Sequence, residues 1–336
     1  MPSASPSTPP ETSDCVICGT CVADILVRPV PLETAPGAGR LFHVDPIEVT
    51  TGGIVCNTGT AMARLGMRVA ASSIVGDDVW GDVIRTRLLG EGILTGALET
   101  AAGGATSTTA VLIDPSGERS FAHHGGAPAT IDLAMVRRQL PWFGASRLAL
   151  VGYLGLLPGL EPDLAEALSE IRATGCLVAL ETAGSGGTLE QVAGALESVD
   201  VYVPSLDEAR HQTGLDDPRA IVERYRRHGA AGIVGVKLGT RGTLLSPSAG
   251  EWLEIPCVAA PGPVLDTTGA GDSLLAGLLT GLLRGMPPGD AARLGAAAAA
   301  CCVTALGATA GLRGYGETAR LAGLAEAASE SQPSRK

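Results

Sequence analysis

The stretch Asp266-Thr267-Thr268-Gly269-Ala270-Gly271-Asp272-Ser273 stands directly before residues 274–283, an apolar segment with the length and composition of a buried helix. Gly269 and Gly271 let successive backbone N–H groups converge without obstruction by side chains. The helix start adds about half a positive charge at the same point. The stretch therefore predicts an anion hole, formed by Gly269, Ala270 and Gly271, that could stabilise a phosphoryl group during its transfer.

Asp272 falls in the first turn of this predicted helix, beside the anion hole. A substrate hydroxyl that attacks phosphorus would have to lie there, so the Asp272 carboxylate is placed to accept the proton as a general base. An acidic residue at a helix start is also a common cap, and Asp272 taken alone favours that simpler interpretation. Within the whole octet, the catalytic interpretation is favoured.

The familiar nucleotide-binding loops are missing from the sequence. A Walker A loop needs Gly-Lys-Ser/Thr, but Lys237 is followed by Leu238 and Lys336 ends the chain. A dinucleotide fingerprint needs a third glycine where the chain has Leu274. The signatures of protein kinases are missing as well. The remaining interpretation is a kinase that binds ATP without either loop.

Short apolar runs alternate with helical patterns through the middle of the chain. This alternation predicts an α/β fold, with a doubly wound, mostly parallel sheet and helices on both faces. After the last such strand, two runs predict an antiparallel hairpin. The predicted strands are 148–152, 176–180, 199–203 and 232–238, the helices 162–174, 189–197 and 207–212, and the hairpin strands 242–245 and 251–255.

Two stretches interrupt this alternation and predict strands without helices, at 25–49 and 107–124. The first contains four prolines, which are confined to edges and turns of sheets. We expect both stretches to pair into a small β-sheet lid over a cleft. The core would then comprise residues 14–24, 50–106 and 125–326, and the polar ends, 1–13 and 327–336, are predicted to be disordered tails.

The composition limits the classes of partner. The formal net charge of −11 argues against nucleic acid, which needs a basic face. The longest apolar stretch, 294–306, is too short for the roughly 20 residues that span a bilayer, and no secretion signal is recognisable at the N-terminus. We therefore expect a small-molecule substrate, no membrane partner and a cytoplasmic location.

Eight cysteines are expected to be thiols in a reducing compartment. Cys15, Cys18 and Cys21 have a spacing that could suit zinc or an iron–sulfur cluster. They lie in an apolar run ending at Ala23 that predicts one buried strand, on which Cys15 and Cys18 would point to opposite faces. Buried structural thiols are the favoured interpretation, and the same holds for the vicinal pair Cys301 and Cys302.

With these motifs in place, the chain resembles the PfkB (ribokinase-like) carbohydrate kinases. Residues 266–273 are similar to the family's C-terminal signature, in which the aspartate of Gly-Ala-Gly-Asp is the catalytic base. The likeness continues in sequence order over roughly residues 15 to 316. The other matching segments are Gly52-Gly53-Ile54-Val55-Cys56-Asn57, Ala63-Arg64-Leu65-Gly66, Val75-Gly76-Asp77, Gly117-Glu118-Arg119 and Leu238-Gly239-Thr240-Arg241-Gly242.

The resemblance implies roles for further residues. Sugar hydroxyls would be bound near the first strand, ATP along a groove, Mg²⁺ indirectly through Glu208, and a monovalent cation such as K⁺ by Asp266 and Thr268. The adenine would lie against residues 303–310, and a homodimer would form through the lid. The implied substrate-binding residues are Asp24, Gly52, Gly53, Asn57 and Asp272, and the implied ATP-binding residues are Ser205, Glu208, Gly239, Thr240, Gly242, Gly269 and Gly271. Each also has a simpler interpretation as a turn, cap or strand-end residue.

Three positions depart from the family pattern. Ser205 replaces the asparagine of the family's Asn-x-x-Glu, and Glu181 stands where many members have aspartate. After the lid, Pro128 stands where Gly-Ala-Asn is common in the family. Arg119, His123 and His124 could reach the substrate from the lid, although exposed strand residues are the simpler interpretation. Lys237 has no assigned role and could point to solvent.

The acceptor is expected to be a sugar or sugar derivative. A nucleoside kinase is the alternative, but an aromatic platform for the base is the usual device, and the chain has three Trp, four Tyr and three Phe. A catalytically silent ligand-binding relative is the third interpretation, against which the retained Asp272 argues.

Overall fold

The structure is a computed structural model that describes residues 10–33, 37, 39–184 and 186–324. Residues 1–9 of the predicted N-terminal tail and the whole predicted C-terminal tail, 327–336, lie outside these described residues. The predicted N-terminal tail also overlaps the first strand, which begins at Ser13.

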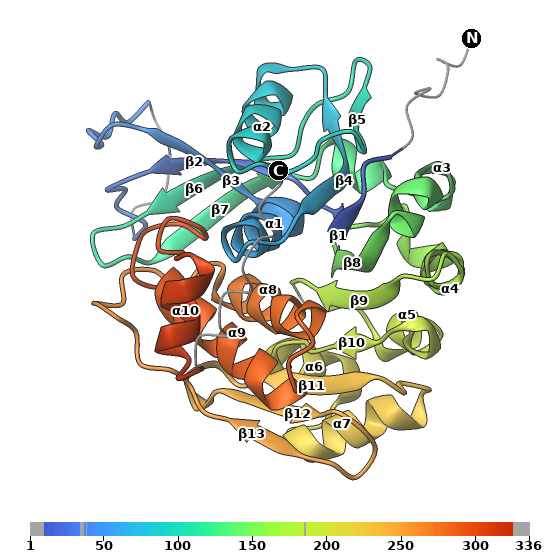
Figure 1. Ribbon diagram of the computed structural model, residues 1–336. Coiled ribbons are helices and arrows are strands. Elements are labelled where there is room, and N and C mark those ends of the chain that lie inside the picture. Colours follow the sequence, from blue (N-terminus) through green and yellow to red (C-terminus); the bar gives the residue numbers. More distant parts are fainter. Residues whose placement is uncertain (1–9, 34–36, 38, 185, 325–336) are drawn as a thin grey trace, which may run out of the picture.

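A nine-stranded sheet runs through the middle of the described molecule (Figure 1). Its strands pair in parallel except at the end formed by β12 and β13, which are antiparallel as the predicted hairpin requires. The order is β13-β12-β11-β10-β9-β8-β1-β4-β5. The strands are β1 (Ser13–Gly19), β4 (Val69–Gly76), β5 (Leu98–Ala101), β8 (Ser146–Leu154), β9 (Leu177–Thr182), β10 (Val201–Tyr202), β11 (Ile233–Lys237), β12 (Thr243–Ser246) and β13 (Leu253–Ile255).

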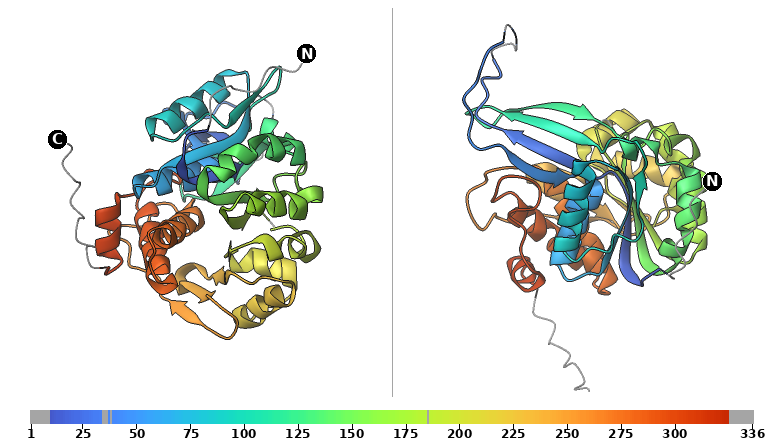
Figure 2. Two further views of the ribbon diagram at one scale, coloured as in Figure 1. Left: turned by 45° about the vertical axis from the view of Figure 1, so that its right-hand side comes forward. Right: turned by 90° about the horizontal axis from the view of Figure 1, so that it is seen from above.

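Helices cover both faces of this sheet, so the predicted doubly wound α/β class is confirmed (Figure 2). One face packs against α3 (Leu133–Gly144), α4 (Leu164–Ala173), α5 (Leu189–Ala193), α6 (Leu206–Thr213) and α7 (Pro218–Arg227). The other packs against α1 (Gly53–Arg64), α2 (Val79–Gly90), α8 (Ala270–Leu283) and α9 (Pro288–Cys302), and α10 (Tyr315–Leu321) lies against α9.

The central strand β1 alternates between these two cores. Val16 and Cys18 belong to one hydrophobic cluster, and Cys15 and Ile17 belong to the other. Cys15 and Cys18 therefore point to opposite faces of the sheet, as the strand pattern predicted. Among the described residues, no group of three or more Cys, His, Asp or Glu side chains could hold a metal ion.

A second sheet of four strands, in the order β3-β2-β6-β7, confirms the predicted separate small sheet. Its strands are β2 (Val22–Val27), β3 (Glu48–Gly52), β6 (Thr108–Ile113) and β7 (Arg119–His124). The predicted boundaries need correction, because residues 22–24 and 50–52, assigned to the core, belong to this sheet. Apolar residues stand on both sides of Gly19-Thr20, in β1 and in β2, so hydrophobicity alone did not reveal that the chain leaves the main sheet after Gly19.

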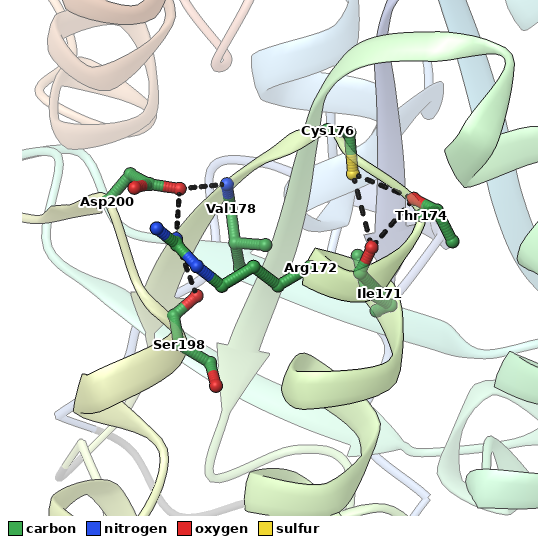
Figure 3. Close-up of polar contacts among 7 residues, drawn as sticks. All are labelled: Ile171, Arg172, Thr174, Cys176, Val178, Ser198 and Asp200. Atoms are coloured by element: carbon green, nitrogen blue, oxygen red, sulfur yellow. Dashed lines mark hydrogen bonds and ion pairs between the residues drawn. The ribbon is translucent and has the colours of Figure 1, made fainter.

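Polar contacts hold the amino end of β9, an inner strand of the main sheet (Figure 3). Asp200 accepts hydrogen bonds at Oδ2 from the Val178 backbone N–H (2.8 Å) and from Arg172 Nη1 (2.7 Å). The Cys176 thiol donates to the Ile171 carbonyl (3.6 Å). These contacts join α4, β9 and the segment before β10, and so set the register of the strand whose other end carries Glu181.

Strand β1 lies between β4 and β8 and pairs with both. The helices connected to these two neighbouring strands pack on opposite faces of the sheet. Ligands of open α/β sheets bind beyond the carboxyl ends of the strands at such a switch point.

Within the described ranges, every helix is too short or too polar to cross a bilayer.

Candidate active site

A cleft of about 880 Å³ lies between the small sheet and the carboxyl ends of the parallel strands. It brings together most of the residues that the sequence singled out, from segments more than 200 positions apart. Those that line it are Asp24, Gly52, Gly53, Asn57, Ser205, Glu208, Gly239, Asp266, Thr268, Gly269, Gly271 and Asp272.

Three predicted site residues are not in this lining: Thr240, Gly242 and Ala270. Thr240 lies within the short turn Gly239–Arg241 at the rim. Gly242 follows this turn, and a Cβ placed there would lie 2.0 Å from the Ile255 carbonyl oxygen. The approach of β13 therefore accounts for this glycine without a ligand.

The start of α8 has the features of the predicted anion hole. Gly269 is the N-cap residue, with φ of 76°, and a Cβ there would lie 2.5 Å from Ala308 Cβ. The N–H groups of Ala270 and Ser273 bond to the carbonyls of Thr267 and Gly269. Those of Gly271 and Asp272 have no acceptor among the described residues, so two helix-start donors remain for an anion.

Asp272 lies in the first turn of α8 and is buried. Its Oδ2 accepts hydrogen bonds from Asn57 Nδ2 (2.9 Å) and from the Tyr153 hydroxyl (2.7 Å). Burial raises the pKa of Asp272, and the two hydrogen bonds act in the opposite direction. Because both donors use Oδ2, Oδ1 remains for a substrate hydroxyl.

Tyr153 is a site residue that the sequence analysis missed. It is the one non-glycine residue with positive φ (65°) in the described part of the chain, a conformation that costs free energy and is common at functional sites. It follows a glycine near the end of β8, and this position at a strand's carboxyl end was the signal that could have found it.

The other end of the cleft is rich in hydrogen-bonding groups. Burial raises the pKa of the Asp24 carboxyl to about 6, against a hydrogen bond from Thr109 on the neighbouring strand. Gly53 has φ of 81°, and a Cβ there would lie 2.4 Å from the Thr20 carbonyl oxygen. Asn57 Oδ1 and the Thr20 hydroxyl are buried and lack a hydrogen-bond partner among the described residues, so they are open to a polar ligand.

The lid reaches the loop before α8 through Arg119. Its guanidinium forms an ion pair with Asp266 Oδ1 (2.6 Å) and a hydrogen bond with the Thr268 hydroxyl. Asp266 also accepts from the backbone N–H groups of Thr268 and Gly307. The backbone bonds and Arg119 hold the pKa of Asp266 below its usual range, although partial burial acts to raise it.

This arrangement does not fit the monovalent cation that the resemblance implied at Asp266 and Thr268. Both side chains already contact a guanidinium, and a second cation beside it would be repelled. A cation could bind there only if Arg119 moved away.

Ser205 and Glu208 form a capping box at the start of α6. The Ser205 backbone N–H and hydroxyl each lie 2.7 Å from Glu208 Oε2, and the Glu208 N–H donates to the Ser205 hydroxyl (3.3 Å). Serine in place of the family's asparagine thus still orients the glutamate, and both residues line the cleft.

Glu181 and Lys237 form a buried ion pair in the cleft wall. From the sequence, Glu181 is only a departure from the family pattern, and Lys237 has no assigned role and could point to solvent. That interpretation is wrong, since Lys237 is 9% exposed. Of the two lid histidines, His123 lines the cleft and forms a hydrogen bond with the Thr109 hydroxyl (3.0 Å). His124 is not part of the lining, and its backbone carbonyl accepts a hydrogen bond from the Ser107 hydroxyl.

The pattern described as pfkB family carbohydrate kinase matches residues 14–313. The chain belongs to the pfkB family of carbohydrate kinases. It is therefore a phosphotransferase, and the expected enzyme class is confirmed.

Curated relatives agree with this membership. The kinase is 29% identical over 297 residues to a ribokinase of Haemophilus influenzae, covering 87% of the chain and 92% of the relative. It is 29% identical over 287 residues to a fructokinase of Klebsiella pneumoniae, covering 82% and 87%.

Solved structures agree on the fold. Arabidopsis thaliana ribokinase, complexed with ribose and ATP, has a TM-score of 0.79 at 21% identity and covers 93% of this chain and 99% of its own. A nucleoside kinase of Methanocaldococcus jannaschii, described as an archaeal member of the ribokinase family, has a TM-score of 0.73 at 19% identity, with 93% and 99% covered.

Proposed function

We propose that this kinase transfers the γ-phosphoryl group of ATP to a hydroxyl of a sugar or sugar-derived molecule, with Asp272 as the general base. The observation that carries the proposal is the position of the Asp272 carboxylate. It lies between the polar sugar-side group Asn57 and the free N–H groups at the start of α8.

The reaction uses these groups in one in-line step. The acceptor oxygen forms a bond to the γ-phosphorus and passes its proton to Asp272 Oδ1. The bond from phosphorus to the bridging oxygen breaks, and its electron pair leaves with ADP. The N–H groups of Gly271 and Asp272 stabilise the charge on the equatorial oxygens, where preorganised donors contribute most.

The remaining assignments follow the same geometry. Asp24, Asn57 and the glycine pair Gly52-Gly53 would bind sugar hydroxyls, and Gly239 would border the triphosphate. Leu306, Gly307 and Ala308 line the cleft on the side assigned to adenine. The oriented carboxylate of Glu208 could hold Mg²⁺, which commonly keeps several of its water ligands. When bound, the ion would neutralise part of the charge on the phosphates.

A nucleoside acceptor is the second candidate. The lid strand β7 contributes Phe121 and His123 to the cleft lining, which also includes Tyr153. Phe121 is 63% exposed, so a ring on that strand could stack a base. The likeness to the archaeal nucleoside kinase agrees in fold alone.

We also propose a homodimer through the lid and a cytoplasmic location. The dimer is supported by β7, an edge strand of the small sheet that carries the exposed Phe121. The cytoplasmic location is supported by the cysteines, none of which forms a disulfide within the described residues.

The test is a coupled ADP-release assay over sugars, sugar acids, polyols and nucleosides. Turnover of one sugar class supports the proposal, and turnover confined to nucleosides selects the second candidate. Tight ATP binding without turnover of any compound would instead indicate the catalytically silent relative.

A further inference from the structure

Lys237 ends β11, and its side chain passes beyond the end of the short strand β10 to reach Glu181 on β9. Its backbone N–H donates to the Pro204 carbonyl (2.8 Å), which fixes the position of the side chain's base. The side chains of Lys237 and Glu181 are 10% and 4% exposed. The ammonium group is thus held at a defined place inside the cleft wall.

That place adjoins the anion hole. A Cβ built on Gly271 would lie 3.4 Å from Lys237 Nζ, and the other close atoms would be the end of the same lysine side chain. Glycine at this position therefore leaves open the space between the ammonium group and the free N–H groups at the start of α8. An anion seated on those N–H groups would face the ammonium directly.

The surrounding charges make this cation necessary. Burial lowers the pKa of Lys237, but the carboxylates of Glu181, Glu208 and Asp272 outweigh burial and raise it, so the lysine stays protonated. Burial also raises the pKa of Glu181, to about 8, against the opposing effect of Lys237, so the ammonium group keeps this carboxyl from being neutralised further. Without the ammonium group, the negative charge of the surrounding carboxyl groups would repel a triphosphate. Nζ has three N–H donors, so it can contact Glu181 and a phosphoryl oxygen at the same time.

We infer that Lys237 is a further catalytic residue, whose ammonium group contacts the phosphoryl group as it moves from ATP to the acceptor. Glu181 is its positioning residue. The inference deepens the proposed function and rests on it. No proton leaves Lys237; the acceptor proton still goes to Asp272 and the leaving electron pair to ADP. The positive charge of the ammonium group stabilises the negative charge on the equatorial oxygens, and it does so most strongly in the transition state.

The alternative is that the pair only ties β9 to β11. Glu181 Oε2 argues against that role, because it is buried and has no hydrogen-bond partner among the described residues. A purely structural pair would be expected to satisfy both carboxylate oxygens. The Arg172–Asp200 pair gives the control, since this ion pair joins α4 to the segment before β10 outside the cleft lining (Figure 3).

The test compares Lys237→Met, Lys237→Arg, Glu181→Gln and the control Arg172→Met. Two affinities are measured for each: for the non-hydrolysable analogue AMP-PNP, and for ADP with aluminium fluoride, a mimic of the transferring phosphoryl group, both with Mg²⁺ and the acceptor. We expect Lys237→Met to lower kcat and the aluminium fluoride affinity by about 10²–10³, the usual cost of one oxyanion donor, with a much smaller loss for AMP-PNP. Arg172→Met should change neither.

Equal losses for both ligands, or none, in Lys237→Met would overturn the inference. Should Lys237→Met fail to fold, Glu181→Gln, which preserves volume and the lysine, decides: a selective loss of aluminium fluoride affinity supports the inference, and unchanged affinity refutes it. If the wild type phosphorylates an acceptor and Lys237→Met keeps both affinities and kcat, the role of Lys237 is refuted but the proposed function is not. Wild-type protein that phosphorylates no acceptor refutes the proposed function, and with it the inference that rests on it.

Discussion

The guanidinium of Arg119 lies 2.6 Å from Asp266 Oδ1, so a strand of the lid is joined directly to the loop before α8. The Asp266 side chain is 5% exposed and that of Arg119 is 20% exposed, which makes the contact one of the better shielded ion pairs in the described molecule. The position of the small sheet over the cleft and the order of the loop before α8 are therefore linked through one side chain.

Arg119→Ala is expected to loosen the lid and free Asp266. We predict a rise in the acceptor KM of about tenfold, equivalent to about 1.4 kcal/mol. We also predict that K⁺ has little effect on the wild type but activates the variant, because the cation can then take the place of the guanidinium. Initial rates with and without KCl at constant ionic strength check this. Strong activation of the wild type by K⁺, with none gained by the variant, would contradict it.

Binding of the acceptor should depend on pH through Asp24, whose pKa is raised to about 6. The ionised carboxylate of Asp24 is a stronger acceptor for sugar hydroxyls than the protonated carboxyl, so affinity should increase as pH rises through about 6. Between pH 5 and pH 7 the acceptor Kd should fall by about tenfold if only the ionised form binds. Asp24→Asn should bind weakly at every pH, and a wild-type Kd that is flat over this range would refute the role of Asp24.

The same carboxyl affects stability with the opposite sign. A folded-state pKa above the unfolded value favours folding at low pH, and this contribution is lost as pH rises through about 6. Asp24→Asn should therefore raise Tm at pH 8 relative to wild type and have a smaller effect at pH 5.

Tyr153→Phe removes one of the two hydrogen bonds that stabilise ionised Asp272. The pKa of Asp272 should then rise further, and the acidic limb of the kcat profile should move to higher pH. A purely structural role for Tyr153 would lower kcat equally at all pH values. Asn57→Ser, which weakens the other bond, should move the limb in the same direction.

The contact between α8 and α9 depends on small residues. A Cβ on Gly277 would lie 2.5 Å from the Cα of Gly295, so Gly277→Ala should destabilise the fold by about 1–3 kcal/mol through overpacking. Gly90, at the end of α2, has nothing within 4 Å of an added Cβ, and Gly90→Ala is the control, expected to be neutral or slightly stabilising. Urea unfolding of the two variants distinguishes these outcomes.

Much of the fold was predictable because alternation of apolar runs and helices carries its own signal. The hairpin of β12 and β13 and the helix after Gly269 were expected near their observed positions. The boundary of the lid was not, because Val22 and Ala23 are apolar and buried in either sheet. β10 is also shorter than expected, with two residues in place of five.

Site residues that belong to a contiguous sequence motif were predictable. Site residues that are brought together only by tertiary contacts were not. Asp272, Gly269 and Gly271 stand in one contiguous octet. Tyr153, Glu181 and Lys237 come from three separate strands and acquire meaning only when the parallel sheet brings their carboxyl ends together. The pairing of Arg119 with Asp266 spans 147 positions, and no local pattern announces it.

The most direct test of the account is kcat of Asp272→Asn on the acceptor that the wild type phosphorylates best, measured beside the affinities for ATP and acceptor. The asparagine keeps the shape of the side chain but cannot accept the proton. We predict that kcat falls by about 10²–10⁴ while both affinities stay near their wild-type values. A variant that turns over at the wild-type rate would show that Asp272 is not the base.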